Sequence, residues 1–189
     1  MATNVVFEVD TRVIERLIEQ LLIAIGEDPQ REGLRNTPKR VARFWKEFIE
    51  YDPGNHVTVF ESIKVDQMVA VSDMRVWSLC EHHLLPFWCD VSIGYIANDK
   101  VLGLSKFGRI VKKHSHRLQI QERLVQDIAA DVMRIVGTEN VAVLAKGEHL
   151  CMTMRGIELP AIMSSSSING SFRNAEVRAE FLSLIGHGG

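Results

Sequence analysis

Three side chains that can bind a metal or move a proton are crowded into the stretch SLCEHHLLP, residues 78–86. Cys80, His82 and His83 lie within four residues of each other, in a chain of 189 residues that has only three cysteines and seven histidines. A catalytic zinc ion typically takes three protein ligands and leaves a fourth position for water. Cys80 and His83 are separated by two residues, a spacing at which one loop can direct both side chains at one ion. The stretch therefore predicts half of a metal site.

The other half of such a site must come from elsewhere in the sequence, and GEHLCMTMRG, residues 147–156, offers His149 and Cys151. If this segment is a strand, residues two apart project from the same face, so these two side chains are expected to lie side by side. A single cysteine more often behaves as a small buried hydrophobe. Spacing alone therefore leaves a zinc site and structural thiols open as alternatives. For Cys89, which lies in a strand-like run without such neighbours, we predict a core position.

The composition is typical of a globular protein with one packed domain and a small helical attachment. Hydrophobic residues make up 46% of the chain and charged residues 24%, and the net charge of −2 gives no reason to expect nucleic-acid binding. The odd number of cysteines does not suggest a secreted disulfide framework. The opening residues lack the basic and apolar regions of a secretion signal, and no apolar run reaches membrane-spanning length. We predict a cytoplasmic protein with reduced thiols.

Hydrophobic spacing predicts helices at the start of the chain and strands afterwards. Apolar residues four apart predict a helix over residues 11–26, and Pro38 suits the first turn of a second helix over residues 38–51. From about residue 57 the chain becomes β-branched and apolar with short breaks, which is typical of strands. Residues 98–100 form a candidate hairpin turn between two of these strands.

Helical spacing returns over residues 107–136, in two pieces that are expected to meet near residues 114–118. Gly137 is the expected end of the second piece. Residues 140–156 are expected to return to strand, and residues 174–186 to finish as a short helix. This order of elements predicts an α+β fold rather than alternating α/β.

Five strings, in order between residues 27 and 156, carry a resemblance to a known family. They are EDPQREGLRNTPKRV, SLCEHHLLPF, GLSKFGRIV, RLQIQERL and HLCMTMRG. The sequence resembles GTP cyclohydrolase I, the zinc enzyme that opens the imidazole ring of GTP in the first step of pterin and folate biosynthesis. The resemblance implies that Cys80, His83 and Cys151 ligate zinc, and that His82 and His149 are catalytic. Thiolate and imidazole ligands favour zinc and also accept Fe(II).

The activity implied by the resemblance is hydrolysis at C8 of guanine, followed by rearrangement. Zinc lowers the pKa of its bound water from 15.7 to roughly 7, which makes hydroxide available for attack at C8. His149 is expected to donate the proton that N7 gains, because imidazole titrates near neutral pH. His82 is expected to assist later proton transfers or to orient the water. Formate is released, and the expected product is 7,8-dihydroneopterin triphosphate.

The resemblance also assigns the substrate contacts. Glu122 is expected to accept hydrogen bonds from N1–H and the amino group of guanine, which adenine cannot satisfy because its N1 carries no hydrogen. Gln121 is expected to lie near the base and ribose. The expected contacts to the ribose and triphosphate are Ser105, Lys106, Arg109 and Arg155. The histidines of KKHSHRLQ, His114 and His116, are expected on the surface, with a second metal site or a pH-sensitive contact as alternatives.

The resemblance implies a tunnelling fold, in which helices pack on one side of an antiparallel sheet. We expect an N-terminal helical region over residues 1–55 and a catalytic domain over residues 56–189, assembled into a toroidal homodecamer with active sites at subunit interfaces. GTP is the expected substrate, with no nucleic-acid or membrane partner. One alternative is a nitrile reductase of deazaguanine metabolism, a tunnelling-fold enzyme with a nucleophilic cysteine and no zinc, and the two metal halves argue against it. The other is a nucleotide sensor with structural zinc, and the two catalytic histidines argue against that one.

Overall fold

The computed structural model describes residues 8–61 and 67–186. The chain divides between Asp52 and Pro53 into two compact units, a helical one and a larger mixed one. The first seven residues, which contribute to the expectation that there is no secretion signal, lie outside the described residues. No helix in the described ranges combines the length and the apolar character needed to cross a membrane.

The first unit contains two helices, α1 (Thr11–Ala24) and α2 (Thr37–Ile49), as the apolar spacing predicts. The Asp10 side chain accepts a hydrogen bond of 3.0 Å from a backbone N–H in the first turn of α1, and so caps that helix. Pro38 lies in the first turn of α2, where its missing N–H removes no helical hydrogen bond. The buried apolar side chains of this unit are Leu22, Ala42 and Phe48.

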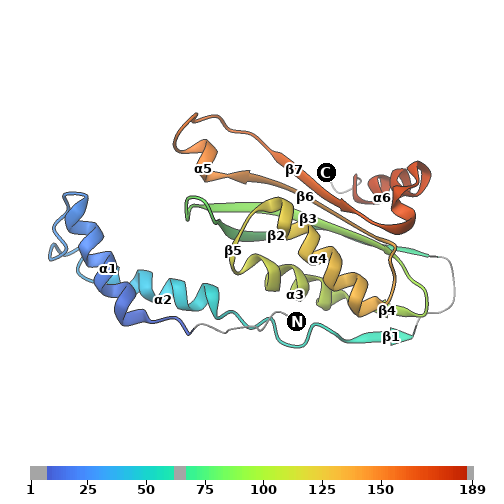
Figure 1. Ribbon diagram of the computed structural model, residues 1–189, viewed down its shortest axis with the longest axis horizontal. Helices are drawn as coiled ribbons and strands as arrows, with labels where there is room; N and C mark the ends of the chain where they lie inside the picture. The colour runs from blue at the N-terminus through green and yellow to red at the C-terminus, as the bar shows by residue number, and fades with distance from the viewer. Residues whose placement is uncertain (1–7, 62–66, 187–189) are drawn as a thin grey trace. The chain divides into compact units, whose positions relative to one another are not determined.

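The second unit is built on a five-stranded sheet with the order β5-β2-β3-β6-β7 (Figure 1). Its strands are β2 (Met68–Cys80), β3 (Pro86–Ile96), β5 (Leu118–Gln119), β6 (Val141–His149) and β7 (Met163–Ile168). Neighbouring strands are antiparallel, except that the short β5 runs parallel to β2. Leu79 pairs with Pro86, and Phe87 pairs with His149. This register brings the CEHH turn, which joins β2 to β3, close to the end of β6.

One face of the sheet is covered by α3 (Leu104–Ser115) and α4 (Gln121–Val136), with β5 between them in the sequence. The long helical stretch therefore forms in two pieces, as expected. Alternate residues of β3 point into the core on this face: Phe87, Cys89, Val91, Ile93 and Tyr95. Cys89 has the core position predicted for it, and burial raises the pKa of its thiol to about 12.

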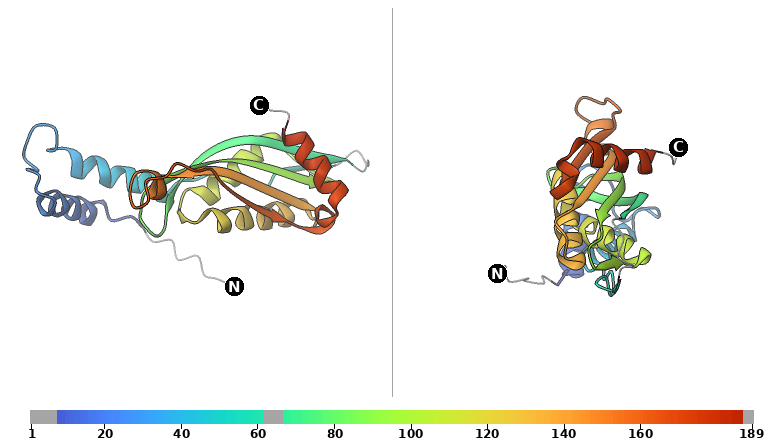
Figure 2. Two further views of the ribbon diagram at one scale, coloured as in Figure 1. Left: turned by 90° about the horizontal axis from the view of Figure 1, so that it is seen from above. Right: turned by 90° about the vertical axis from the view of Figure 1, so that its right-hand side faces the viewer.

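The opposite face of the sheet carries a helix as well, which differs from the expectation that helices pack on one side only (Figure 2). This helix is α6 (Ala175–Gly186), and its Phe181 is buried against Ala142. A methyl group added at Gly94 would lie 2.5 Å from the Phe181 ring. Gly94 and Ala142 are paired neighbours in β3 and β6, so two small residues on this face leave room for the aromatic ring.

The hairpin expected at residues 98–100 is not formed. β4 (Lys100–Leu102) pairs instead with β1 (Val59–Glu61), in a separate two-stranded sheet. The reason lies in the order of the larger sheet, because β2 and β6 already occupy both edges of β3. A strand that follows β3 has no free hydrogen-bonding edge there and must pair elsewhere.

Candidate metal centre

Cys80, His83 and Cys151 meet at one point of the second unit. One ligand atom from each, a sulfur from both cysteines and a ring nitrogen from the histidine, lies within 4.8 Å of the other two. Cys80 ends β2, and a tight turn follows in which the Leu84 N–H donates to the Cys80 carbonyl at 2.8 Å. Leu84 has a φ of 56°, in the left-handed region. The turn brings His83 back beside Cys80, and Cys151 arrives from the end of β6.

The donors at this point suit a divalent metal ion. Two thiols and one imidazole provide three ligands and leave a fourth position for water or substrate, the pattern of catalytic zinc sites. Burial raises the pKa of the Cys151 thiol, and the neighbouring Cys80 sulfur raises it further. Two thiolates this close are unfavourable without a cation, whereas a bound metal ion deprotonates a coordinating thiol. The site therefore fits a soft divalent ion.

Cys151 reaches the site from a single helical turn, which corrects the expectation of a strand over residues 140–156. β6 ends at His149, and α5 (Leu150–Thr153) begins immediately afterwards. The Thr153 hydroxyl lies 3.2 Å from the His149 carbonyl and 3.0 Å from a carboxylate oxygen of Glu148, and it can donate to either. This local alternative to strand pairing stabilises the turn. His149 and Cys151 therefore do not share a strand face.

His149 is held on two sides. Its ring stacks on the Phe87 ring with centroids 4.5 Å apart and planes 7° apart. Its Nε2 lies 3.0 Å from Oε1 of Gln121. Burial lowers the pKa of His149, and the negative charge of Glu122 acts in the opposite direction. The imidazole therefore has a fixed position and an environment that favours its neutral form.

The CEHH turn is also joined to the start of α4. His82 is exposed, with Nδ1 3.9 Å from the Cys80 sulfur. Glu81 forms a two-pronged ion pair with Arg123, with nitrogen–oxygen distances of 2.7 and 3.0 Å. Because Arg123 directly follows Glu122, this pair links the turn that carries two candidate metal ligands to the segment expected to recognise guanine.

Gln121 and Glu122 both open α4, but their surroundings differ. Glu122 is exposed in the first turn, where the helix dipole favours a carboxylate. Gln121 is fully buried, and its Nε2 donates to the backbone carbonyls of Ala145 and Met163, each at 3.1 Å. Both residues act on His149, one through a hydrogen bond and the other through its charge.

Two of the basic residues expected to bind triphosphate, Lys106 and Arg109, lie on α3 and donate hydrogen bonds to the start of the second unit. Lys106 Nζ donates to the Asn55 carbonyl at 2.9 Å, and the Arg109 guanidinium donates to the Pro53 carbonyl. Among the described residues, no hydrogen bond or ion pair joins Lys106 or Arg109 to the three candidate metal ligands. The other two positions expected to contact the ribose and triphosphate, Ser105 and Arg155, are exposed.

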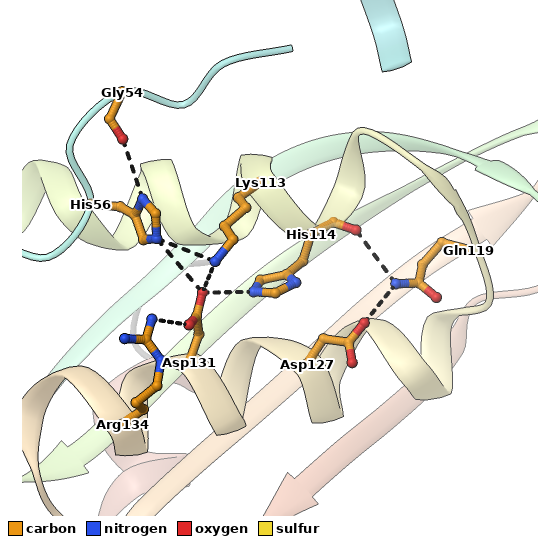
Figure 3. Close-up of polar contacts among 8 residues, drawn as sticks. All are labelled: Gly54, His56, Lys113, His114, Gln119, Asp127, Asp131 and Arg134. Carbon is orange, nitrogen blue, oxygen red and sulfur yellow. Dashed lines mark hydrogen bonds and ion pairs between the residues drawn. The ribbon is translucent and has the colours of Figure 1, made fainter. Parts of the chain in front are cut away.

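A polar cluster that the sequence analysis missed surrounds Asp131 of α4 (Figure 3). Lys113 Nζ and His114 Nε2 lie 2.7 and 2.9 Å from one carboxylate oxygen, Arg134 binds the other, and His56 Nε2 lies 3.2 Å from Lys113 Nζ. The side chains of His114 and Asp131 are 11% and 8% exposed, so His114 is not the surface histidine that was expected. The sequence offered one signal for this cluster: Asp131 is an acidic residue on the apolar stripe of α4. A carboxylate buried there requires polar or charged partners.

The family model and the similar curated proteins indicate one family. The sequence profile of the family described as GTP cyclohydrolase I matches residues 14–186. A protein of Sulfurihydrogenibium named GTP cyclohydrolase 1 is 47% identical over 180 residues, covering 94% of this chain and 96% of its own length. Proteins of the same name from Methylococcus capsulatus and Dehalococcoides mccartyi are 47% and 43% identical, covering 92% and 95% of this chain and 97% and 99% of their own. The crystal structure of the archaeosine synthase QueF-Like in its apo form overlaps with 55% of this chain and 96% of its own, with a TM-score of 0.42 and 21% identity.

Proposed function

The chain belongs to the GTP cyclohydrolase I family, and we propose that it performs this family's reaction at the centre formed by Cys80, His83 and Cys151. The reaction is hydrolytic opening of the guanine imidazole ring of GTP, with release of formate and rearrangement to 7,8-dihydroneopterin triphosphate. The observation that carries this proposal is the convergence of two thiols and one imidazole within 4.8 Å, two residues along the chain from a histidine held by stacking and a hydrogen bond.

The proposed metal is zinc, held by the two thiolates and the imidazole. When bound there, zinc supplies a Lewis acid and lowers the pKa of a coordinated water to roughly 7. The Leu84-to-Cys80 hydrogen bond forms the turn that presents two of the three ligands, so the chain needs little reorganisation to bind the ion. Zinc is the natural match for two thiolates and one imidazole.

The protein's own groups are proposed to bind and orient the base. The exposed Glu122 carboxylate can accept two parallel hydrogen bonds from N1–H and the 2-amino group of guanine, a pattern that rejects adenine. His149, which is half-buried and whose pKa is lowered by burial and raised by the charge of that carboxylate, is the proposed carrier of the proton that N7 gains. His82 lies exposed on the turn and is the proposed group for the later proton transfers of ring opening and rearrangement.

The triphosphate is proposed to bind Ser105, Lys106, Arg109 and Arg155. Lys106 and Arg109 donate to backbone carbonyls, which are neutral acceptors. Hydrogen bonds from cationic side chains to phosphate oxygens are charge-assisted and stronger, so a triphosphate can displace these carbonyls. The net charge of −2 gives no general attraction for an anion, so this local group must provide it.

We further propose the tunnelling fold, a homodecamer and a cytoplasmic location. The family resemblance supports the assembly. Exposed apolar side chains support it too: Leu17 and Leu21 in α1 are 56% and 53% exposed, and Ile25, directly after the helix, is 64% exposed. Such a stripe is typical of a surface covered by another subunit. Light scattering of the purified protein tests this part of the proposal, and a stable monomer would contradict it.

The first experiment is formate release from GTP by the purified protein, with and without a chelator, together with the absorbance of a dihydropterin product. Formate and pterin, both lost on chelation and both restored by zinc, are the expected results. Formate without pterin would indicate an enzyme that stops at ring opening. Neither product from a zinc-loaded oligomer would favour the nucleotide sensor. As a check on the site, His149→Ala should abolish turnover while leaving the metal content unchanged.

A further inference from the structure

Gln121 is more deeply buried than contact with a substrate requires. Its side chain is fully buried, and each of its polar atoms has a partner within the chain. The amide contacts the carbonyls of Ala145 in β6 and Met163 in β7, and it also contacts His149. The start of α4 is therefore connected through one side chain to two strands and to the proposed proton carrier.

These contacts determine which way round the amide lies. Backbone carbonyls can only accept hydrogen bonds, so the group 3.1 Å from both Ala145 and Met163 must be the NH₂ of Gln121. The atom that faces His149 at 3.0 Å is then the amide oxygen, which can only accept. A neutral imidazole can make this bond only if its Nε2 carries the hydrogen. Nδ1 is left as the acceptor of the ring.

We propose that Gln121 is a positioning residue that holds His149 in the Nε2–H tautomer and so directs the lone pair of Nδ1 to the reacting base. This inference rests on the proposed function and assigns Gln121 a role through His149. Metal-ligating and catalytic histidines are commonly fixed in this way by a partner on the other ring nitrogen. Stacking on Phe87 restricts the tilt of the same ring, so the amide sets its rotation within that plane.

The assignment gives His149 a defined part in the hydration of guanine. As water adds to C8, the new carbon–oxygen bond forms and the electron pair of the C8–N7 double bond moves to N7. Nδ1 of His149 takes one proton from the water and passes it to N7, so the ring ends the step neutral and in its starting tautomer. The sum is one water added across C8 and N7. A histidine in the other tautomer presents an N–H at Nδ1 and has no lone pair there to take the proton.

The tautomer can be read without any turnover. Solid-state NMR of the zinc-loaded, full-length protein labelled with ¹⁵N-histidine distinguishes a protonated ring nitrogen from an unprotonated one, and loss of signals in His149→Ala assigns the ring. We expect His149 to show a protonated, hydrogen-bonded Nε2 and an unprotonated Nδ1. A protonated Nδ1 in the wild-type protein overturns the inference, whether or not the protein converts GTP. Failure of the proposed function would appear separately, as absence of formate release by the same wild-type sample.

A variant pair tests the consequence for catalysis. Gln121→Met keeps an unbranched side chain of similar length and removes the amide. Gln119→Met is the matched control, because Gln119 is also fully buried but bonds to Asp127 and the His114 carbonyl. We expect kcat to fall about 10- to 100-fold in Gln121→Met with KM changed less than about 3-fold, and the His149 tautomer to become mixed. A raised KM with normal kcat, or an equal loss of kcat in Gln119→Met, would contradict the positioning role.

Discussion

The cluster around Asp131 makes a quantitative prediction about stability. The Asp131 side chain is 8% exposed and bonds to Lys113, His114 and Arg134. Replacing the carboxylate by an amide leaves these donors with one neutral acceptor. Breaking a buried ion pair costs about 3–5 kcal/mol. The Arg134 side chain is 61% exposed, so solvent screens its ion pair with Asp131 and that pair contributes about 1 kcal/mol or less. We expect Asp131→Asn to lower the free energy of unfolding by about 2–4 kcal/mol at pH 7.

The stability lost in Asp131→Asn should depend on pH, and the pKa of Asp131 fixes the direction of that dependence. Burial alone raises the pKa of Asp131, but hydrogen bonds from His114, Lys113 and Arg134 outweigh burial and hold the pKa far below its ordinary range. A carboxylate with a depressed folded-state pKa contributes its full stability above the unfolded-state pKa of about 3.9 and loses it as the pH falls towards the folded-state value. The difference between the wild type and Asp131→Asn should therefore be constant near neutral pH and shrink below about pH 4. His56 also faces this carboxylate, at 4.0 Å.

The measurement is urea unfolding at fixed protein concentration, since an oligomer's stability depends on concentration. Asp127→Asn is the matched control on the same helix, because Asp127 accepts one hydrogen bond, at 3.1 Å, from the neutral amide of Gln119. We expect that change to cost less than about 1 kcal/mol. If both variants lose the same stability, or if the deficit of Asp131→Asn does not shrink below pH 4, the account of this cluster is wrong.

Three other substitutions or reagents test separate parts of the fold and site. Gly94→Val should lower the free energy of unfolding by about 1–3 kcal/mol, because the added side chain would press on the Phe181 ring. Adding Phe181→Leu should restore part of the lost stability in thermal unfolding. An unchanged melting temperature in Gly94→Val would be evidence against this packing. Glu81→Arg should reduce kcat for GTP, and adding Arg123→Glu should recover much of it, because the swapped pair can re-form the bridge; no recovery would mean that the ion pair does not position the turn. Cys89 should resist iodoacetamide in the folded, metal-free protein and react only on unfolding, since its thiol has a pKa of about 12 and no exposed surface; early modification found by mass spectrometry would contradict this.

Part of the candidate metal centre could be predicted from the sequence because it depends on short spacings. Two of its proposed ligands, Cys80 and His83, are three positions apart in one turn, and a turn of that length leaves few arrangements of the two side chains. The apolar periodicity that predicts α1, α2 and α4 is likewise a local property. The prediction of a hairpin was wrong because pairing between strands far apart in the sequence decides where β4 lies. Residues 98–100 have the composition of a hairpin turn, but the strand that follows has no open edge of β3 to pair with.

The side chains near His149 show a second feature that the sequence alone did not predict, namely which of two adjacent polar residues is buried. From sequence, Gln121 and Glu122 are two adjacent polar residues at a helix start, and both are expected to face the substrate. Successive positions on a helix point about 100° apart, so a sheet packed against one of them leaves the other exposed. Which of the two is buried depends on where β6 and β7 cross α4. The packing that buries Gln121 also places its amide 3.0 Å from the His149 ring. A buried polar residue beside a candidate site is therefore interpreted through the neighbours that it hydrogen-bonds, because solvent and substrate cannot reach it.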